Sequence, residues 1–292
     1  CRTGLCAGFD GVIFCRDQSE RNRILRLRHV FFCLTIMRIA SWNVNSIKAR
    51  LDIVTGWLAT DPCDVLLIQE TKSQDVNFPI DAFQALGWHV AFHGQKSYNG
   101  VAIASRFPME DIVMGLEGDA EDEQARYMEA TINGFRVATI YLPNGNPAPG
   151  PKFDYKLGWM ARLEARALAL LNDEKPVILG GDFNVIPDDI DCYDPAGWAG
   201  DALTRPESRS AFRSLLHKGY ADALRSLNPT GVFFSYWDYQ AGAWQRDHGV
   251  RIDHLLLSPE ALDRLEDVGI DRAPRGLEKP SDHTPIWCQL RA

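Results

Sequence analysis

The stretch that most constrains the fold lies at residues 177–184, with the sequence VILGGDFN. Three β-favouring apolar residues run into two glycines and then two short polar side chains, which is typical of a buried strand that ends at a cleft. Because side chains alternate in extended backbone, Asp182 and Asn184 point to the same side and can act on one ligand. An Asx-rich turn after a core strand would have the same pattern, so the rest of the chain must distinguish the two interpretations.

Bulk composition indicates an ordinary globular protein, with 46% hydrophobic and 24% charged residues in a chain of 292. This length is ample for one large α/β domain. The formal net charge of −8 gives no bulk attraction to nucleic acid, so a site for a polyanion would have to be a local basic patch. The seven cysteines form no CxxC or Cys/His cluster, which favours free thiols in a reducing cytoplasm over a zinc site.

The first 36 residues differ from the rest, with six arginines, three acidic residues and an apolar run at 30–37. This order resembles a signal peptide, but no small-residue cleavage site precedes the strand-like residues 38–43. The apolar run is also shorter than the ~20 residues that a membrane span needs. We expect residues 1–36 to be a dispensable, poorly ordered extension, Met37 to be the functional start, and residues 37–292 to form one catalytic domain.

Strand-like and helix-like segments alternate from Met37 onward. Strands are expected at 38–43, 65–68, 88–93, 101–105, 128–132, 136–141, 177–182, 233–237 and 252–257, with a last one starting near Thr284. Helices are expected from an N-cap at Ser46 to about Leu58, over the apolar stripe between Phe153 and Leu171, and near 209–218.

Polar side chains fall at the ends of these strands. They are Asn43, Glu70, Asp182 with Asn184, Asp253, and Asp282 with His283. Each alone suits a turn or a cap, but layered α/β folds assemble their sites at strand ends. Four carboxylates and a histidine meeting there would repel one another without a cation. Oxygen ligands without cysteine favour Mg²⁺, with Mn²⁺ as an alternative.

Six short motifs carry a family resemblance. They are SWNVN at 41–45, QETK at 69–72, YLPNG at 141–145, GDFN at 181–184, RIDH at 251–254 and SDHTP at 281–285. In this order they resemble the exonuclease III / apurinic–apyrimidinic (AP) endonuclease family of the endonuclease–exonuclease–phosphatase superfamily. The resemblance covers 37–292 and none of 1–36. It implies a four-layer α/β/β/α sandwich, in which two mixed β-sheets pack face to face between helices.

The resemblance also implies roles for the polar residues. Glu70 would be the main metal ligand, with Asn43 and Asp282 in support, and Asp182, Asn184 and His283 complete the set of possible ligands. Asp182 would deprotonate the attacking water with help from Asn184. His283, polarised by Asp253, would hold a phosphate oxygen, and Tyr141 and Asn144 would donate to the same phosphate. The alternative is that His283 is the general base and Asp253 orients it.

DNA binding is expected from Lys72 and Arg126, with Asn45 and Asn146 as neutral phosphate donors beside Asn144, and should weaken steeply with salt. The weaker basic candidates are Lys48, Arg50, Lys96, Lys152, Lys156 and Arg246. In the resembling enzymes an aromatic residue at the place of Tyr236 lines a pocket for a flipped, base-free sugar. Trp237 beside it is a further DNA-binding candidate, with core packing as the alternative.

Together these features predict a monomeric, Mg²⁺-dependent DNA-repair phosphodiesterase. Its substrate would be double-stranded DNA, incised 5′ to AP sites, with 3′→5′ exonuclease and 3′-end-trimming activity at the same site. Two other classes stay open. One is a phosphoesterase of the same fold that acts on a phosphate ester outside DNA, and the other is a non-catalytic DNA-binding protein.

Overall fold

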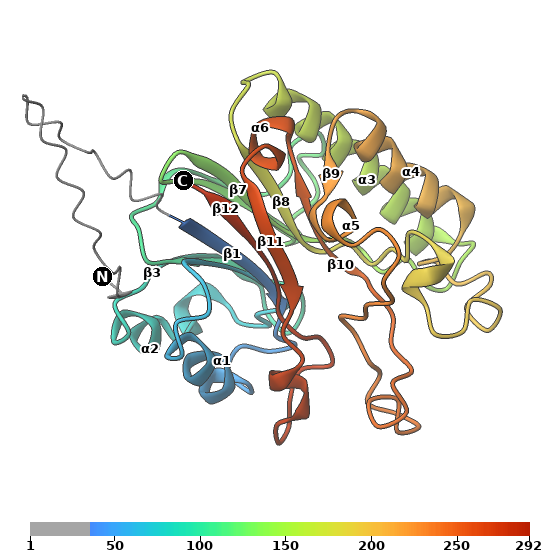
Figure 1. The fold of residues 1–292 in the computed structure, drawn as a ribbon, viewed down its shortest axis with the longest axis horizontal. Helices are drawn as coiled ribbons and strands as arrows, with labels where there is room; N and C mark the ends of the chain where they lie inside the picture. The colour runs from blue at the N-terminus through green and yellow to red at the C-terminus, as the bar shows by residue number, and fades with distance from the viewer. Residues whose placement is uncertain (1–35) are drawn as a thin grey trace, which may run out of the picture. The chain divides into compact units, whose positions relative to one another are not determined.

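The computed structural model describes residues 36–292 (Figure 1), so the expectations for 1–35 lie outside the described part of the chain. Two mixed sheets of six strands each form its centre. The first has the order β11 (Leu265–Ile270), β12 (Ile286–Arg291), β1 (Ile36–Asn43), β2 (Val65–Gln69), β4 (Val101–Ser105) and β3 (His89–His93). The second has the order β5 (Glu110–Met114), β6 (Tyr127–Ile132), β7 (Phe135–Tyr141), β8 (Val177–Asp182), β10 (Asp253–Leu257) and β9 (Ala221–Asp222).

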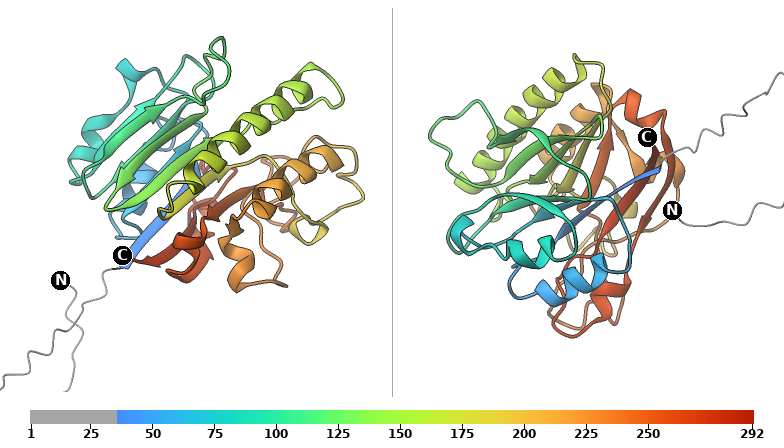
Figure 2. Two further views of the ribbon diagram at one scale, coloured as in Figure 1. Left: turned by 90° about the horizontal axis from the view of Figure 1, so that it is seen from above. Right: turned by 90° about the vertical axis from the view of Figure 1, so that its left-hand side faces the viewer.

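Helices cover the outer face of each sheet (Figures 1 and 2). The helices are α1 (Leu51–Leu58), α2 (Ile80–Gln84), α3 (Pro151–Leu171), α4 (Pro206–His217), α5 (Ala223–Leu227) and α6 (Pro259–Leu262), with short 3₁₀ turns at Asp75–Asn77, Asp189–Asp191 and Ala273–Gly276. Apolar residues of α1 and α2 pack on β1, β2 and β4, while those of α3 and α4 pack on β7, β8 and β10. A third cluster lies between the two sheets. The predicted four-layer sandwich is therefore confirmed.

Strand β8, the centre of the sequence argument, is buried along its whole length. It pairs in parallel with β7 and antiparallel with β10. A Cβ atom on Gly181 would lie 1.9 Å from the carbonyl oxygen of Ile140, and one on Gly180 would lie 2.6 Å from a methyl carbon of Leu67 in the other sheet. At Gly181 only glycine fits, because the backbone of the neighbouring strand β7 occupies the space of a side chain, whereas at Gly180 a side chain would displace the end of Leu67 from the facing sheet.

Two predicted elements are wrong. The first helix begins at Leu51 rather than after Ser46, because Ser46 has a φ of +88° and its backbone N–H donates to the carbonyl oxygen of Glu70 (2.7 Å). This bond ties the segment to the end of β2 instead of starting a helix. The predicted strand at 233–237 is not formed either, since in this segment only Tyr236 makes ladder-like bridges, to Val250 and His283.

The edge strands β5 and β11 are absent from the prediction. Both are short, rich in acidic residues and only partly buried, so they lack the apolar alternation that marks a strand in sequence. The three cysteines in the described part, Cys63, Cys192 and Cys288, are free and buried, as predicted. Among residues 36–292 no helix combines the length and the apolar character that a membrane crossing requires.

Candidate active site

Strand ends from both sheets meet at one edge of the sandwich. Strands β1 and β2 run parallel in the first sheet, and β7 and β8 run parallel in the second. Asn43 ends β1, Glu70 follows β2, and Asp182 ends β8. The Asn43 amide joins the sheets, since its Nδ2 donates to Glu70 Oε1 (2.9 Å) and to Asp182 Oδ2 (3.0 Å). The structure therefore brings together three residues that lie up to 139 positions apart in the chain.

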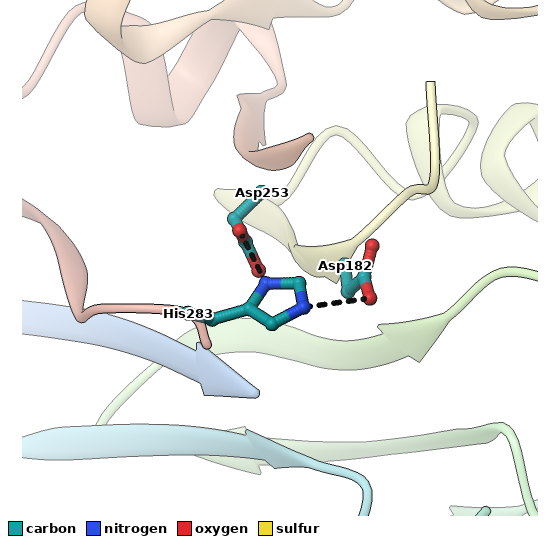
Figure 3. Close-up of side chains that lie close together, drawn as sticks. All are labelled: Asp182, Asp253 and His283. Carbon is teal, nitrogen blue, oxygen red and sulfur yellow. Dashed lines mark hydrogen bonds and ion pairs between the residues drawn. The ribbon is translucent and has the colours of Figure 1, made fainter. Parts of the chain in front are cut away.

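The buried side chains of Asp253, His283 and Asp182 lie in a row, with the His283 ring between the two carboxyl groups (Figure 3). Nδ1 of His283 lies 2.8 Å from Asp253 Oδ2, and Nε2 lies 3.7 Å from Asp182 Oδ2. Ser235 donates its hydroxyl to the same Asp253 oxygen (2.6 Å). Burial by itself would lower the pKa of His283, but the carboxylates of Asp253 and Asp182 outweigh it and raise the pKa to about 10. These two carboxylates therefore favour the protonated imidazolium form of the ring.

The pKa of Asp182 is also raised, but here burial is the largest cause. Burial raises its pKa to about 7, against the opposing charge of His283 and with a further raising effect from Asp253 and Glu70. Its Oδ1 accepts a hydrogen bond from the backbone N–H of Asn184 (2.9 Å). A carboxylate whose pKa lies near neutrality can take up a proton during a reaction.

Glu70 and Lys72 form an ion pair beside this row of side chains. Lys72 Nζ lies 2.7 Å from Glu70 Oε2 and donates to Asn45 Oδ1 (2.6 Å). Both residues have left-handed backbone, with φ of +52° for Glu70 and +48° for Lys72. Burial would raise the pKa of Glu70, but Lys72 and the amide of Asn43 lower it overall. Asp282 joins the group through Asn45, whose Nδ2 donates to Asp282 Oδ1 (3.1 Å).

Two asparagines from the loops after β7 and β8 face each other. Asn144 Nδ2 donates to Asn184 Oδ1 (3.0 Å), and Asn184 Nδ2 donates to the carbonyl oxygen of Leu142 (2.9 Å). Beneath them lies Lys156 of α3, which is fully buried. Its Nζ donates to the backbone carbonyls of Asn144 (3.0 Å) and Asn184 (2.6 Å). Lys156 therefore joins the two loops from below, although the sequence predicts it only as a weaker basic candidate for DNA binding.

Tyr141 ends β7 and lies under Arg126. The Arg126 guanidinium stacks 4.7 Å from the centre of the Tyr141 ring, and its Nη1 donates to the Tyr141 carbonyl oxygen (3.2 Å). Burial, followed by the charges of Glu70 and Asp182, raises the pKa of Tyr141 well above its ordinary value. The phenol therefore keeps its proton and can act as a hydrogen-bond donor.

A cavity of about 250 Å³ opens over these residues. Its lining combines the polar strand-end residues with Trp198, Leu203, Tyr236 and Ile252. The Tyr236 ring packs against His283, with 4.9 Å between ring centres. Trp198 and Leu203 were not predicted, because they come from the irregular loop after β8, which has no periodic pattern.

Trp237 does not line this cavity. Its side chain is fully buried, and its indole N–H donates to Asp247 (3.0 Å). The ring packs edge-on against Phe234 and Trp244. The prediction of Trp237 as a DNA-binding residue is therefore wrong, and the core-packing alternative holds.

The donor atoms of the site suit a hard divalent cation. Within residues 36–292, Asp182, Asp253 and His283 are the one group of three side chains of metal-ligating type whose candidate ligand atoms lie within 4.8 Å of one another. While the His283 ring is protonated, only the two carboxyl groups of this set can bind a cation. Asp253 Oδ1 is buried without a hydrogen-bond partner, and Glu70 adds a further ionised oxygen ligand close by. Carboxylate and amide oxygens are ligands that hard divalent cations prefer.

Comparison with known proteins agrees with this geometry. Residues 40–283 match the Endonuclease/Exonuclease/phosphatase family. This chain belongs to that family. It is 34% identical over 267 residues to exodeoxyribonuclease III of Haemophilus influenzae, a match that covers 87% of this chain and 100% of the relative.

Two solved structures extend the comparison. One is a 3′ phosphatase from Neisseria bound to a product DNA hairpin, with 41% identity, a TM-score of 0.85 and coverage of 87% of this chain and 99% of the other. The second is an AP endonuclease from Archaeoglobus fulgidus, with 36% identity, a TM-score of 0.85 and coverage of 88% and 100%. The family resemblance predicted from the six motifs is thus confirmed.

Proposed function

We propose that this protein hydrolyses phosphodiester bonds in double-stranded DNA, incising 5′ to AP sites and trimming 3′ ends, with Mg²⁺ as the preferred metal. The observation that carries the proposal is Asp182, a buried carboxylate with a pKa near neutrality, held beside an imidazolium and two amides. The names of the relatives support it, since an exodeoxyribonuclease, a 3′ phosphatase and an AP endonuclease all act on DNA ends or lesions. The cytoplasmic location and the monomeric state stay predictions.

The protein's own residues divide the hydrolysis between them. Asp182 takes a proton from the attacking water, which Asn184 and Asn43 orient. Because His283 is protonated and held by Asp253, it faces the phosphate as a charged donor rather than as a base. This charge state favours Asp182 over His283 as the general base.

Further donors and the metal complete the proposed site. The Tyr141 hydroxyl and the Asn144 amide donate to phosphate oxygens. A divalent cation held by Glu70, with Asn43 and Asp282 in support, would neutralise phosphate charge and stabilise the leaving alkoxide. Lys72 and Asn45 lie beside Glu70 and contribute to phosphate binding.

DNA binding rests on this local patch, because the net charge of the chain is −8. Arg126 and Lys72 flank the cavity through their contacts with Tyr141 and Glu70. The part of the cavity lined by Tyr236 is where the base-free sugar would sit. A missing base lowers the cost of turning the sugar out of the helix, so AP sites are favoured.

The deciding experiment uses two matched duplexes, one with a central AP site and one with a recessed 3′ end. Wild-type protein should cleave both with Mg²⁺ and neither with EDTA. Asp182→Asn should lower turnover by about 10²- to 10⁴-fold, because the amide cannot accept the proton of the water. Its affinity for DNA, measured by fluorescence anisotropy in Ca²⁺, should stay within about threefold of wild type, since no phosphate contact is removed.

Asp188→Asn is the matched control, because Asp188 is an exposed acid on the loop after β8. It should leave turnover unchanged. Wild-type turnover by Asp182→Asn would refute the proposed role of Asp182. Robust cleavage of a non-DNA phosphate ester by a wild-type protein that leaves both duplexes intact would refute the substrate assignment.

A further inference from the structure

Asp201 is an acidic residue in the wall of the cavity that would receive a polyanionic substrate. It lies on the loop after β8, partly buried, next to the apolar side chains of Trp198, Leu203 and Ile252. A free carboxylate in such a place repels phosphate and weakens DNA binding. Its presence therefore calls for a function in the cavity.

A clamp between two loops holds the Asp201 carboxylate in one orientation. Asn146, on the loop after β7, donates its Nδ2 to both Asp201 oxygens (3.1 Å each). The backbone N–H of Leu203 donates to Oδ1 (2.9 Å). Asn146 is itself fixed, because its Oδ1 accepts from the backbone N–H of Ala202 (3.1 Å).

The carboxylate keeps free acceptor capacity. In the described part of the chain no lysine or arginine lies within ion-pair distance of Asp201, so its charge is held by neutral donors. An ionised carboxylate offers about four lone-pair positions, and these donors leave at least one of them open. Trp198, Leu203 and Ile252, which line the same cavity, have apolar side chains, so Asp201 adds a charged acceptor to this lining that a ligand can reach.

The ligand that fits is neutral, carries a hydroxyl and is small enough to lie against apolar walls. A base-free deoxyribose in its ring form meets these requirements, since a hydroxyl at C1′ replaces the base. An intact nucleotide has no such hydroxyl, because the base occupies C1′. Building on the proposed function, we propose that Asp201 accepts a hydrogen bond from the C1′ hydroxyl of the flipped sugar and so selects AP sites.

The test compares two duplexes that differ by this one hydroxyl, a natural AP site and its tetrahydrofuran analogue, which has hydrogen at C1′. Wild-type kcat/KM should favour the natural site by about tenfold or more, as for a hydroxyl hydrogen-bonded to a charged acceptor. Asp201→Ala should bring the ratio close to one, mainly by losing activity on the natural site. Asp201→Asn, which keeps the side-chain volume, should give a ratio between the two.

Asp194→Asn is the control, an exposed acid on the same loop that should keep the wild-type ratio. Equal wild-type activity on both duplexes would overturn the inference, and so would equal losses on both in the Asp201 variants, since a merely structural role lowers the two alike. If Asp201→Ala does not fold, the wild-type ratio and Asp201→Asn decide. Cleavage of neither duplex by wild type would instead refute the proposed function.

Discussion

The replacement Lys156→Met tests the buried lysine beneath the site. Burial lowers the pKa of Lys156 from 10.5 to about 7, although the charges of Asp182 and Asp201 act to raise it. In the unfolded chain the amine has its ordinary pKa of about 10.4. Between these two values the unfolded state binds a proton that the folded state does not. The stability of the wild-type protein therefore rises with pH across this window.

The magnitude follows from proton linkage. One proton of difference changes the free energy of unfolding by about 1.4 kcal/mol per pH unit, so the rise from pH 7.5 to 9.5 is about 2–3 kcal/mol. Below about pH 7 both states are protonated, and above about pH 10.5 both are neutral, so the slope vanishes there. Lys156→Met removes this contribution, and the wild-type protein should gain about 2–3 kcal/mol relative to the variant from pH 7.5 to 9.5.

Near pH 7 the two proteins should have similar stability. Methionine leaves the carbonyls of Asn144 and Asn184 without their donor, at about 1–3 kcal/mol each. It also relieves a desolvation cost of about 5 kcal/mol that corresponds to the lowered pKa of the lysine. These two effects offset each other within a few kcal/mol.

The assay is urea unfolding of metal-free protein in EDTA at pH 7.5, 8.5 and 9.5, with ionic strength held constant. Subtracting the variant from the wild type cancels the other titrating groups. Lys152→Met, on the exposed side of the same helix, is the control and should show no relative slope. A difference between wild type and Lys156→Met that stays constant across the three pH values would refute the reasoning.

Two further predictions concern charge at the site. Asp253→Asn removes the carboxylate that does most to raise the pKa of His283. The variant should therefore lose incision activity between about pH 6 and 9, where the wild-type ring stays protonated. A pH–rate profile with the same alkaline limb as wild type would contradict this. Arg126→Ala should weaken DNA binding and reduce the slope of the logarithm of the DNA-binding constant against the logarithm of the salt concentration by about 0.9, for one lost phosphate contact. DNA titrations at several salt concentrations measure this slope. An unchanged slope would place Arg126 away from the phosphates.

Much of the site could be read from strand ends. An apolar strand that starts or stops at a polar residue places that residue at the edge of its sheet, and β1, β2, β8 and β10 were recognisable from their apolar runs alone. Asn43, Glu70, Asp182 and Asp253 follow directly from this rule. The edge strands β5 and β11 could not be predicted in this way, because a strand that buries little of its surface needs few apolar residues.

The sequence did not predict how deeply individual side chains are buried. Trp237 and Tyr236 are neighbours with similar character, yet Trp237 is wholly enclosed while Tyr236 lines the cavity. Lys156 has the composition of a surface lysine, but α3 turns it inward beneath two loops. Solvent exposure depends on what other segments pack over a side chain, and local periodicity carries no information about those segments.

By itself the sequence determined the fold class, the family resemblance and the strand-end residues, because these depend on short-range patterns along the chain. The tertiary structure alone decided the distances between the strand-end side chains. The Asn43 amide links Glu70 and Asp182 across two sheets, and Asp201 meets Asn146 across two loops. Such contacts arise from the packing of one sheet on another, and the protonation states of Asp182 and His283 follow from the same packing, since burial and neighbouring charges set both pKa values.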